Sequence, residues 1–244
     1  MKSAFILFSI FILSCTAKQN NDKSKAIFVV DTIKQKTILT DTVNPTTEII
    51  ETFVDSTNIG EKGKSKIELI KHRVLDDIYV IAKFYTKGPH YWYNQNTYLY
   101  ECTGLSGFEP KISDYNNDEF NDITFISATA ARGANEVRRL FIYDNEEKKL
   151  ISIVNSEEFP NMLYNKQLDC IDAFLVTGTA TTVFARILQD SLKAFASVDN
   201  DMNFHSVSIF DKNGNERKMY KVKSNSGEVY VRFRNYKPLE EYAQ

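Results

Sequence analysis

The sequence lacks an excess of charge of either sign and lacks a hydrophobic run long enough to cross a bilayer. Its formal net charge is −2 at pH 7, and its basic and acidic residues are interspersed. Nucleic-acid binding requires clustered positive charge, so we expect no nucleic-acid partner. The apolar run at residues 4–13 falls well short of the roughly 20 residues that a membrane-spanning helix needs. We therefore expect the remainder of the chain to be soluble.

Motifs of common catalytic sites are also missing. The three histidines (His72, His90 and His205) are isolated in the sequence, and it contains no H-E-x-x-H, G-x-S-x-G, phosphate-loop or C-x-x-C pattern. The adjacent acids at 76–77 and 240–241 are more typical of solvated surfaces than of a glycosidase pair. We therefore predict a protein that is not an enzyme, with an all-β hydrolase as the less favoured alternative.

The N-terminus has the pattern of an export signal. Lys2 precedes the apolar run at 4–13, which has the length of the hydrophobic region of a secretory signal peptide. The run ends in Ile-Leu-Ser-Cys at 12–15, which resembles the bacterial lipobox. We predict that residues 1–14 are a lipoprotein signal peptide and that Cys15 carries acyl chains such as palmitate. These chains would hold the protein on a membrane of the bacterial cell envelope, in the periplasm or at the outer-membrane leaflet. The alternatives are a plain anchor helix and a chance cysteine.

A polar segment follows the predicted lipidation site. Residues 15–63 are rich in Thr, Asp, Lys, Asn and Ser, and their apolar patches are sparse. Such a composition offers little burial to offset the ordering entropy, so we predict a tether. An extra edge strand near Ile27 or Ile38 is the alternative. The remaining two cysteines, Cys102 and Cys170, are either a disulfide, which an oxidising compartment would preserve, or two buried thiols.

Residues 64–244 have the pattern of a single all-β domain. Thirteen tyrosines and seventeen phenylalanines, together with the β-branched residues, favour strands. Short alternating segments are bounded by turn residues such as Asn213-Gly214. A short helical turn is expected at 156–164, limited by Pro160. We predict an antiparallel, β-propeller-like fold, with a sandwich or a barrel as alternatives. The predicted strands are 66–72, 77–85, 97–103, 123–129, 137–143, 150–154, 171–177, 182–189, 192–198, 206–210, 218–222 and 229–233.

An acidic loop at 114–122 precedes the strand predicted at 123–129. Oxygen-bearing side chains fall at its first, third, fifth and ninth positions, and the seventh residue can contribute its carbonyl oxygen. Calcium prefers about six to eight oxygen ligands. This pattern resembles the calcium loops of integrin-type and related β-propeller repeats. We predict a calcium site formed by Asp114, Asn116, Asp118, Phe120 and Asp122.

Two positions depart from known calcium loops. The twelfth position is Phe125, where an EF-hand has a bidentate glutamate. The sixth is Glu119, where such loops usually have glycine because the turn favours positive φ. The alternative to calcium is therefore an Asx turn that is closed by hydrogen bonds alone. Repulsion among the three closely spaced aspartates favours the metal.

A longer resemblance extends over roughly residues 111–199. The acidic loop is followed by Gly-Ala-Asn at 133–135 and by Ile-Tyr-Asp at 142–144, with Phe141 where the first tyrosine of a Y-x-Y-D hairpin would stand. This order resembles a group of bacterial periplasmic lipoproteins with a propeller-like β fold. One branch of that group resembles immunity proteins that inhibit lysozyme-like hydrolases of the cell wall. The resemblance implies a lipid-anchored inhibitor whose partner is such a hydrolase.

Two further segments are candidates for binding a partner. One segment, after a Gly-Pro turn, contains His90, Tyr91, Trp92 and Tyr93. Aromatic residues are concentrated in protein-binding hot spots and also stack on sugars. The alternative for this segment is a loop that folds back on the core. The other segment, Ser226 to Tyr230, resembles the S-G-x-x-Y motif of periplasmic lysozyme inhibitors; its alternative is a simple turn. A surface lipoprotein that binds glycans or scaffolds envelope proteins is the alternative function.

Overall fold

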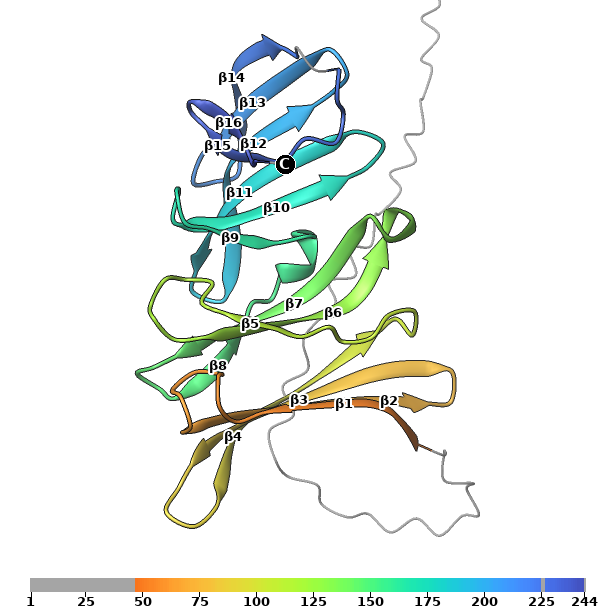
Figure 1. Cartoon of the computed structure of the whole chain (residues 1–244), viewed down its shortest axis with the longest axis vertical. Helices are drawn as coiled ribbons and strands as arrows, with labels where there is room; N and C mark the ends of the chain where they lie inside the picture. The colour runs from red at the N-terminus through yellow and green to blue at the C-terminus, as the bar shows by residue number, and fades with distance from the viewer. Residues whose placement is uncertain (1–46, 225–226, 244) are drawn as a thin grey trace, which may run out of the picture.

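The computed structural model describes residues 47–224 and 227–243. These residues form antiparallel sheets that are stacked along the long axis of the molecule (Figure 1). Helical structure in the described ranges consists of two 3-10 turns, η1 (Ala131–Gly133) and η2 (Ser156–Glu158). None of the helical segments that are described has the length and apolar character needed to cross a membrane.

The sheet at the N-terminal end has the order β1-β2-β3-β4. In β2, the side chains of Ile67 and Leu69 are buried and alternate with partly exposed neighbours, because successive side chains of a strand point to opposite faces. One face of this sheet therefore lies against the rest of the protein. Its strands are β1 (Thr47–Asp55), β2 (Ser65–Val74), β3 (Asp77–Lys87) and β4 (Trp92–Cys102).

The first strand corrects the predicted tether. We expected an unstructured segment up to residue 63, but β1 (Thr47–Asp55) pairs with β2 as an edge strand. Hydrogen-bonded pairing with β2 makes this segment a strand, although its first four residues, which include Ile49 and Ile50, are exposed. The folded part of the chain therefore includes residues 47–63. Residues 15–46 of the tether, like the signal peptide, lie outside the described residues.

The middle sheet, of order β5-β6-β7-β8, is covered on both faces. Along β7, Phe141 and Tyr143 contribute to a core on one side, and Leu140 and Ile142 contribute to a core on the other side. This sheet is therefore the central layer of the stack. Its strands are β5 (Lys111–Ser113), β6 (Asp122–Ala130), β7 (Asn135–Asp144) and β8 (Lys149–Ser152).

The C-terminal sheet has the order β14-β13-β12-β11-β10-β9, and a separate pair, β15-β16, packs against it. A third core, which includes Phe184, Val198 and Phe233, joins the two. The strands of these sheets are β9 (Leu163–Asn165), β10 (Cys170–Val176), β11 (Ala180–Leu188), β12 (Ser191–Asn200), β13 (Phe204–Phe210), β14 (Glu216–Lys223), β15 (Phe233–Tyr236) and β16 (Leu239–Glu241).

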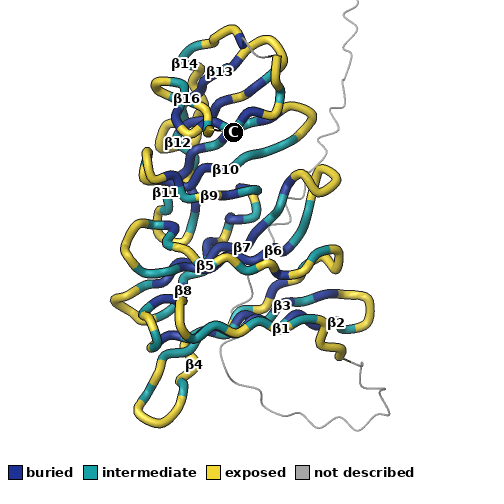
Figure 2. Tube along the Cα trace, in the orientation of Figure 1, coloured by how far each residue is buried: buried dark blue, intermediate teal, exposed yellow. Residues whose placement is uncertain are grey.

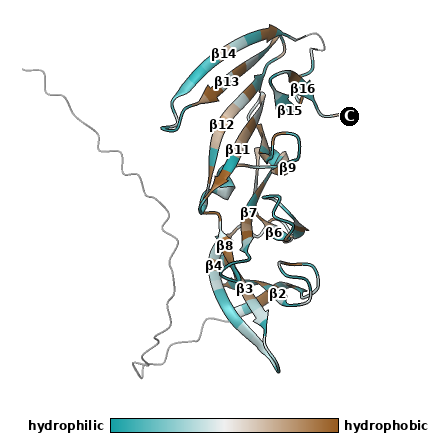
Figure 3. Ribbon diagram, turned by 90° about the vertical axis from the view of Figure 1, so that its left-hand side faces the viewer, coloured by the Kyte–Doolittle hydropathy of each residue, from teal (hydrophilic) through white to brown (hydrophobic). Residues whose placement is uncertain are grey.

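The three cores lie one above another between the sheets. Buried residues follow the central strands, while loops and hairpin ends are exposed (Figure 2). In the view at right angles to Figure 1, the sheets again follow one another along the long axis (Figure 3). The all-β antiparallel prediction is confirmed. None of the described sheets closes into a barrel, and the face-to-face packing is that of the sandwich alternative.

Every strand predicted between 66 and 222 overlaps an observed strand. The strand predicted at 229–233 is wrong, because only Phe233 begins a strand there. Before Phe233, the Val229 carbonyl accepts from the Asn200 side chain and the Arg232 carbonyl accepts from the Tyr242 N–H, and these isolated bonds do not form a strand ladder. The predicted helical turn at 156–164 is shorter than expected, because η2 ends at Glu158 and β9 begins at Leu163.

Candidate functional site

The acidic loop, residues 114–122, connects β5 to β6 and is fixed at both ends. Tyr115 is buried against the core between the middle and C-terminal sheets. Asp122, the first residue of β6, is 0 % exposed. Because these two residues anchor the loop in the sheet, the residues between them have little freedom to move as a unit.

Asp114 organises the first half of the loop. Its Oδ1 accepts hydrogen bonds from the backbone N–H groups of Asn116 at 3.2 Å, Asn117 at 2.6 Å and Asp118 at 3.3 Å. Its Oδ2 accepts the N–H of Glu119 at 2.9 Å. A single carboxylate thus satisfies four successive amides, which is an extended form of an Asx turn.

Asp122 ties the loop to the neighbouring strand. Its Oδ2 accepts the Tyr115 N–H at 2.7 Å, and its Oδ1 accepts the Tyr143 N–H at 2.8 Å. Burial raises the pKa of the Asp122 carboxyl to about 8. The hydrogen bonds from the Tyr143 and Tyr115 amides lower this pKa, and the nearby charges of Asp118 and Asp114 raise it. A cation in the loop would favour the charged form of Asp122.

The oxygen atoms of Asn116 and Asp118 differ in how they are satisfied. Asp118 Oδ1 accepts the Phe120 N–H at 2.9 Å, and Asp118 Oδ2 accepts the Asn116 side-chain amide at 2.8 Å. The Asn116 Oδ1 is buried and has no hydrogen-bond partner. This orphaned oxygen belongs to the third position of the predicted calcium loop, and a cation there would satisfy it.

The sixth position of the loop has the backbone conformation that the sequence pattern implies. Glu119 has φ = +72° and Asn117 has φ = +61°. The expectation that the chain needs a positive φ at this position is therefore confirmed. Asparagine adopts this conformation more readily than glutamate does, so the strain is greater at Glu119.

The described loop is closed by hydrogen bonds, as the alternative to calcium had anticipated. Its aspartates face backbone amides, and within residues 47–224 and 227–243 no three His, Cys, Asp or Glu side chains are grouped so that they could hold a metal ion. The residues that could supply oxygens to calcium are still the predicted ones, since Asn116 keeps a free oxygen and carboxylate oxygens have further lone pairs. Calcium binding stays a prediction.

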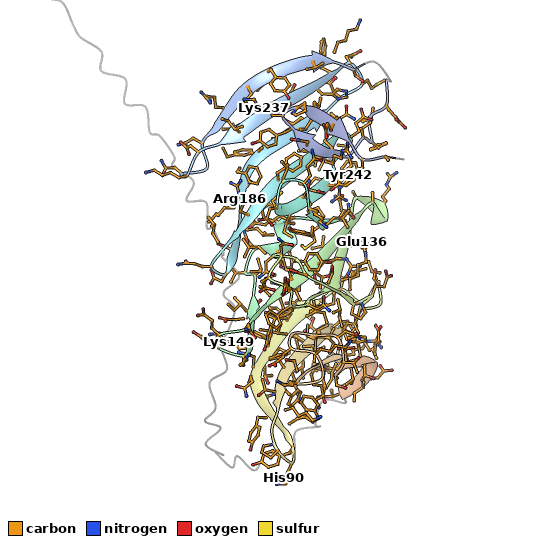
Figure 4. All side chains as sticks on the ribbon, turned by 60° about the vertical axis from the view of Figure 1, so that its left-hand side comes forward. His90, Glu136, Lys149, Arg186, Lys237 and Tyr242 are labelled. Carbon is orange, nitrogen blue, oxygen red and sulfur yellow. The ribbon has the colours of Figure 1, made fainter. Side chains whose placement is uncertain are left out.

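The aromatic segment forms the turn between β3 and β4, and we call residues 87–93 the hairpin tip. Figure 4 shows His90 at one end of the long molecule, beyond the packed sheets. Tyr91 is 59 % exposed and Tyr93 is 41 % exposed, and their ring centres are 4.5 Å apart. The hairpin tip therefore does not fold back on the core.

Trp92 differs from the two tyrosines. It is half-buried, and the Nζ atoms of Lys66 and Lys87 lie 5.6 and 5.9 Å from its ring centre. Sequence reasoning missed these two lysines as parts of the aromatic cluster. The pairing of Trp92 with Lys87 across β3 and β4 brings Lys87 to the ring, and a correct hairpin register in the sequence would have identified that contact.

The segment that resembles S-G-x-x-Y lies near the other end of the molecule. Ser226 is outside the described residues, and Gly227 has φ = +69°. Tyr230 is 61 % exposed. The backbone beside it is held by Asn200, whose Nδ2 donates to the Glu228 and Val229 carbonyls. The structure therefore does not bring this segment together with the hairpin tip, and the two are separate candidate surfaces.

The cysteines do not form the disulfide that was one of the two sequence interpretations. Cys102 and Cys170 are both free, because Cys102 ends β4 in the N-terminal sheet and Cys170 begins β10 in the C-terminal sheet. Burial raises the pKa of each thiol to about 12, so both are neutral at physiological pH. Cys15, the predicted lipidation site, lies outside the described residues.

No protein-family model matches the chain, and no curated protein matches its sequence. A solved structure of a Xanthomonas type IV secretion system related protein is similar over 68 % of this chain and 93 % of that chain, with a TM-score of 0.43 and 8 % identity. At that level the similarity carries no argument about function, and the family resemblance stays a prediction.

Proposed function

We propose that this chain is a non-enzymatic binding protein of the bacterial cell envelope, held there by lipid on Cys15. The observation that carries the proposal is the hairpin tip, which presents Tyr91 and Tyr93 to solvent. Tyrosine supplies a large contact area and a hydrogen-bonding hydroxyl at low cost in side-chain entropy, and it is enriched in the residues that dominate protein interfaces.

The tip is ordered before any partner binds. Gly88 N–H donates to the Tyr91 carbonyl at 2.8 Å, which closes the turn. A Cβ atom on Gly88 would lie 2.0 Å from Tyr93 Cε2, so the Tyr93 ring packs directly on the glycine. Preorganised groups lose less freedom on binding, so this order supports a role in recognition.

We further propose that the partner is a lysozyme-like hydrolase of the cell wall. Enzymes that cleave glycosidic bonds commonly have a pair of carboxyl groups in a cleft. Residues 87–95 contain Lys87 and His90 and no acidic residue. A narrow tip with exposed tyrosines and a basic group suits an acidic cleft in shape and in charge. The resemblance over residues 111–199 points to the same class of partner.

The experiment is inhibition of a panel of lysozymes by the purified chain. We expect inhibition of at least one of them, and we expect Tyr91→Ala combined with Tyr93→Ala to remove it. Leu105→Ala, at another highly exposed residue, is the matched control and should inhibit normally. No change in cell-wall lysis across the panel would contradict the proposed partner. Loss of inhibition in Tyr230→Ala alone would place the contact at the opposite end.

The observed environment of Trp92 favours a protein partner over a glycan. Sugar stacking needs an open ring face, and two lysine ammonium groups lie near the Trp92 ring. A glycan array distinguishes the two functions, because glycan binding that is lost in Trp92→Ala would support the alternative. Turnover of a substrate that fails on mutation of one specific acid would instead show a hydrolase.

Calcium binding by the acidic loop is the other part of the proposal. It is supported by the buried, unpartnered Asn116 Oδ1 and by the carboxylates of Asp114 and Asp118, which bond to Asn116. We expect a higher melting temperature with calcium than with a chelator. Asp118→Ala should remove this difference, whereas Asp199→Ala, outside the loop, should keep it. Identical melting curves of the unmodified protein in calcium and in chelator would contradict the metal.

Lipid anchoring has an independent test. Mass spectrometry of the mature chain should find acyl chains on Cys15 at the new N-terminus. Cys15→Ser should release the protein from the membrane fraction without altering its inhibition of a lysozyme in solution. A chain that stays in the membrane fraction after this substitution would support the plain anchor-helix alternative.

A further inference from the structure

Tyr91 and Tyr93 of the hairpin tip are unusually accessible among the tyrosines of the chain, and we call them the tyrosine pair. All thirteen tyrosines lie in the described ranges, and three of them are exposed: Tyr91, Tyr93 and Tyr230. Tyr230 lies in a separate segment near the other end of the molecule. The hairpin tip therefore presents two tyrosine side chains that a reagent in solution can reach together.

The two rings of the tyrosine pair lie in contact. Their centres are 4.5 Å apart and their planes are tilted by 50°, which is at the short end of the range for paired aromatic side chains. Side chains two residues apart on an extended chain lie on the same side, so the half-buried Trp92 between them lies on the other. A second close pair is less accessible, because the ring centres of Tyr98 and Tyr100 are 6.1 Å apart and Tyr100 is buried.

The arrangement of the tyrosine pair also brings its hydroxyl groups together. A hydrogen bond with the Tyr91 side chain raises the pKa of the Tyr93 hydroxyl. The Cε atoms of each ring are bonded to the carbon that carries the hydroxyl, so Cε atoms of the two rings are close as well. On Tyr93, the ring edge with Cδ2 and Cε2 lies against Gly88, where an added Cβ would be 2.8 and 2.0 Å from these atoms. The opposite edge, which carries Cε1, is left for reaction.

Other groups that oxidants attack are protected or give a different product. Cysteine reacts as the thiolate, and burial raises the pKa of the Cys102 and Cys170 thiols to about 12, so both are neutral. Met202 is 63 % exposed, but its sulfoxide gains an oxygen atom and is recognised by that added mass. Oxidation at the tyrosine pair can therefore be measured separately.

We propose that the tyrosine pair is a modification site, at which hydrogen peroxide and a haem peroxidase form a dityrosine crosslink within the hairpin tip. Each tyrosine loses one electron and its hydroxyl proton, which gives two phenoxyl radicals. The radicals combine in a new bond between a Cε atom of Tyr91 and Cε1 of Tyr93, and the hydrogen atoms of these two carbons move to the phenolic oxygens. Hydrogen peroxide takes up the two electrons and two protons and becomes two water molecules.

The contact between the rings favours a crosslink within one molecule over a crosslink between two. Well-oriented groups in one molecule react as if their concentration were about 10⁵ M or more, which is far above the concentration of any dissolved protein. The crosslink would close a covalent ring through residues 91–93 and fix the end of the hairpin. The reaction depends on the geometry of the tip and not on the function proposed above.

The test uses the full mature chain with Cys15→Ser, which removes lipid attachment, treated with hydrogen peroxide and a haem peroxidase. We expect dityrosine fluorescence and a monomer whose intact mass has lost two hydrogen atoms. The tryptic peptide 88–111 should then give no fragments from cleavage between Tyr91 and Tyr93. Absence of dityrosine would overturn the proposal, as would a crosslink found only between two molecules or only between Tyr98 and Tyr100.

Variants test the residues and their placement. Tyr91→Phe and Tyr93→Phe should each abolish the crosslink within the tip, whereas Tyr230→Phe, the matched change at the third exposed tyrosine, should leave its yield unchanged. Gly88→Ala keeps both tyrosines but displaces the Tyr93 ring, so the crosslink should form more slowly. An undiminished yield in either variant of the tyrosine pair would overturn the assignment. An unchanged rate in Gly88→Ala would show that the observed placement of the rings does not direct the reaction.

Discussion

The acidic loop and the hairpin tip are both connections between neighbouring strands, but their side chains point in opposite directions. In the loop, the carboxylates of Asp114 and Asp122 bond to backbone amides of their own and the adjacent strand. At the tip, the side chains of Tyr91 and Tyr93 are exposed and do not pack into a hydrophobic core. The short polar side chains of the acidic loop therefore stabilise that loop from within. The large aromatic side chains of the hairpin tip are exposed and available to a partner. Mutation should therefore separate stability from binding.

The largest expected effect is in the loop. Asp122→Ala leaves two buried amides, of Tyr115 and Tyr143, without their acceptor. Each unsatisfied buried group costs about 1–3 kcal/mol, so we expect the free energy of unfolding to fall by about 3 kcal/mol. Urea denaturation measures it, with Asp199→Ala, at an exposed aspartate, as the control. A fall of less than about 1 kcal/mol would mean that the loop does not support the fold in this way.

The second effect is at the hairpin tip and concerns binding. Tyr91→Ala with Tyr93→Ala should change the free energy of unfolding by less than about 0.5 kcal/mol, because exposed side chains contribute little to the core. Affinity for the partner should fall at least about tenfold, or about 1.4 kcal/mol. Surface plasmon resonance against an inhibited lysozyme measures this. If stability falls instead and affinity does not, the roles of loop and tip are not separate.

Much of the fold follows from local sequence pattern. Alternating segments predicted the strands from 66 to 222, and Asn213-Gly214 predicted a turn in which Gly214 indeed has φ = +82°. The positive φ at the sixth position of the acidic loop followed from the calcium-loop pattern. Each of these features is set by residues close together in the chain, so the sequence carries them directly.

The features that the sequence did not predict depend on contacts between residues that are far apart in the chain. β1 was not predicted because its apolar residues come in adjacent pairs, Ile49-Ile50 and Phe53-Val54, instead of alternating, and pairing with β2 makes it a strand. The stacking of the sheets is set by contacts such as that between the rings of Tyr98 in β4 and Phe141 in β7, which belong to different sheets. The cavity beside the acidic loop is lined by residues that range from Tyr115 to Ile187 in the sequence. No local pattern encodes these contacts.

A third, smaller effect tests whether the order of the tip matters or only its tyrosines. Gly88→Ala keeps both rings but places a Cβ 2.0 Å from the original position of Tyr93 Cε2, so the ring must move. We expect affinity to fall by roughly 0.5–1.5 kcal/mol, the usual cost of ordering a side chain on binding. The free energy of unfolding should stay nearly constant. Affinity equal to that of the unmodified protein would show that the tip does not need preorganisation.

The smallest effect is expected from relieving strain in the acidic loop. Glu119 has φ = +72°, and its N–H still bonds to Asp114 Oδ2 at 2.9 Å. Glycine adopts this conformation freely but also loses more entropy on folding, so Glu119→Gly should raise the free energy of unfolding by about 0.5–1 kcal/mol. Asn117→Gly is the matched control. Residue 117 also has a positive φ, of +61°, but asparagine adopts this conformation readily. We expect little or no gain from that control. Equal gains at both positions would show that the strain does not depend on the side chain, and a loss at Glu119 would show that the glutamate side chain itself stabilises the loop.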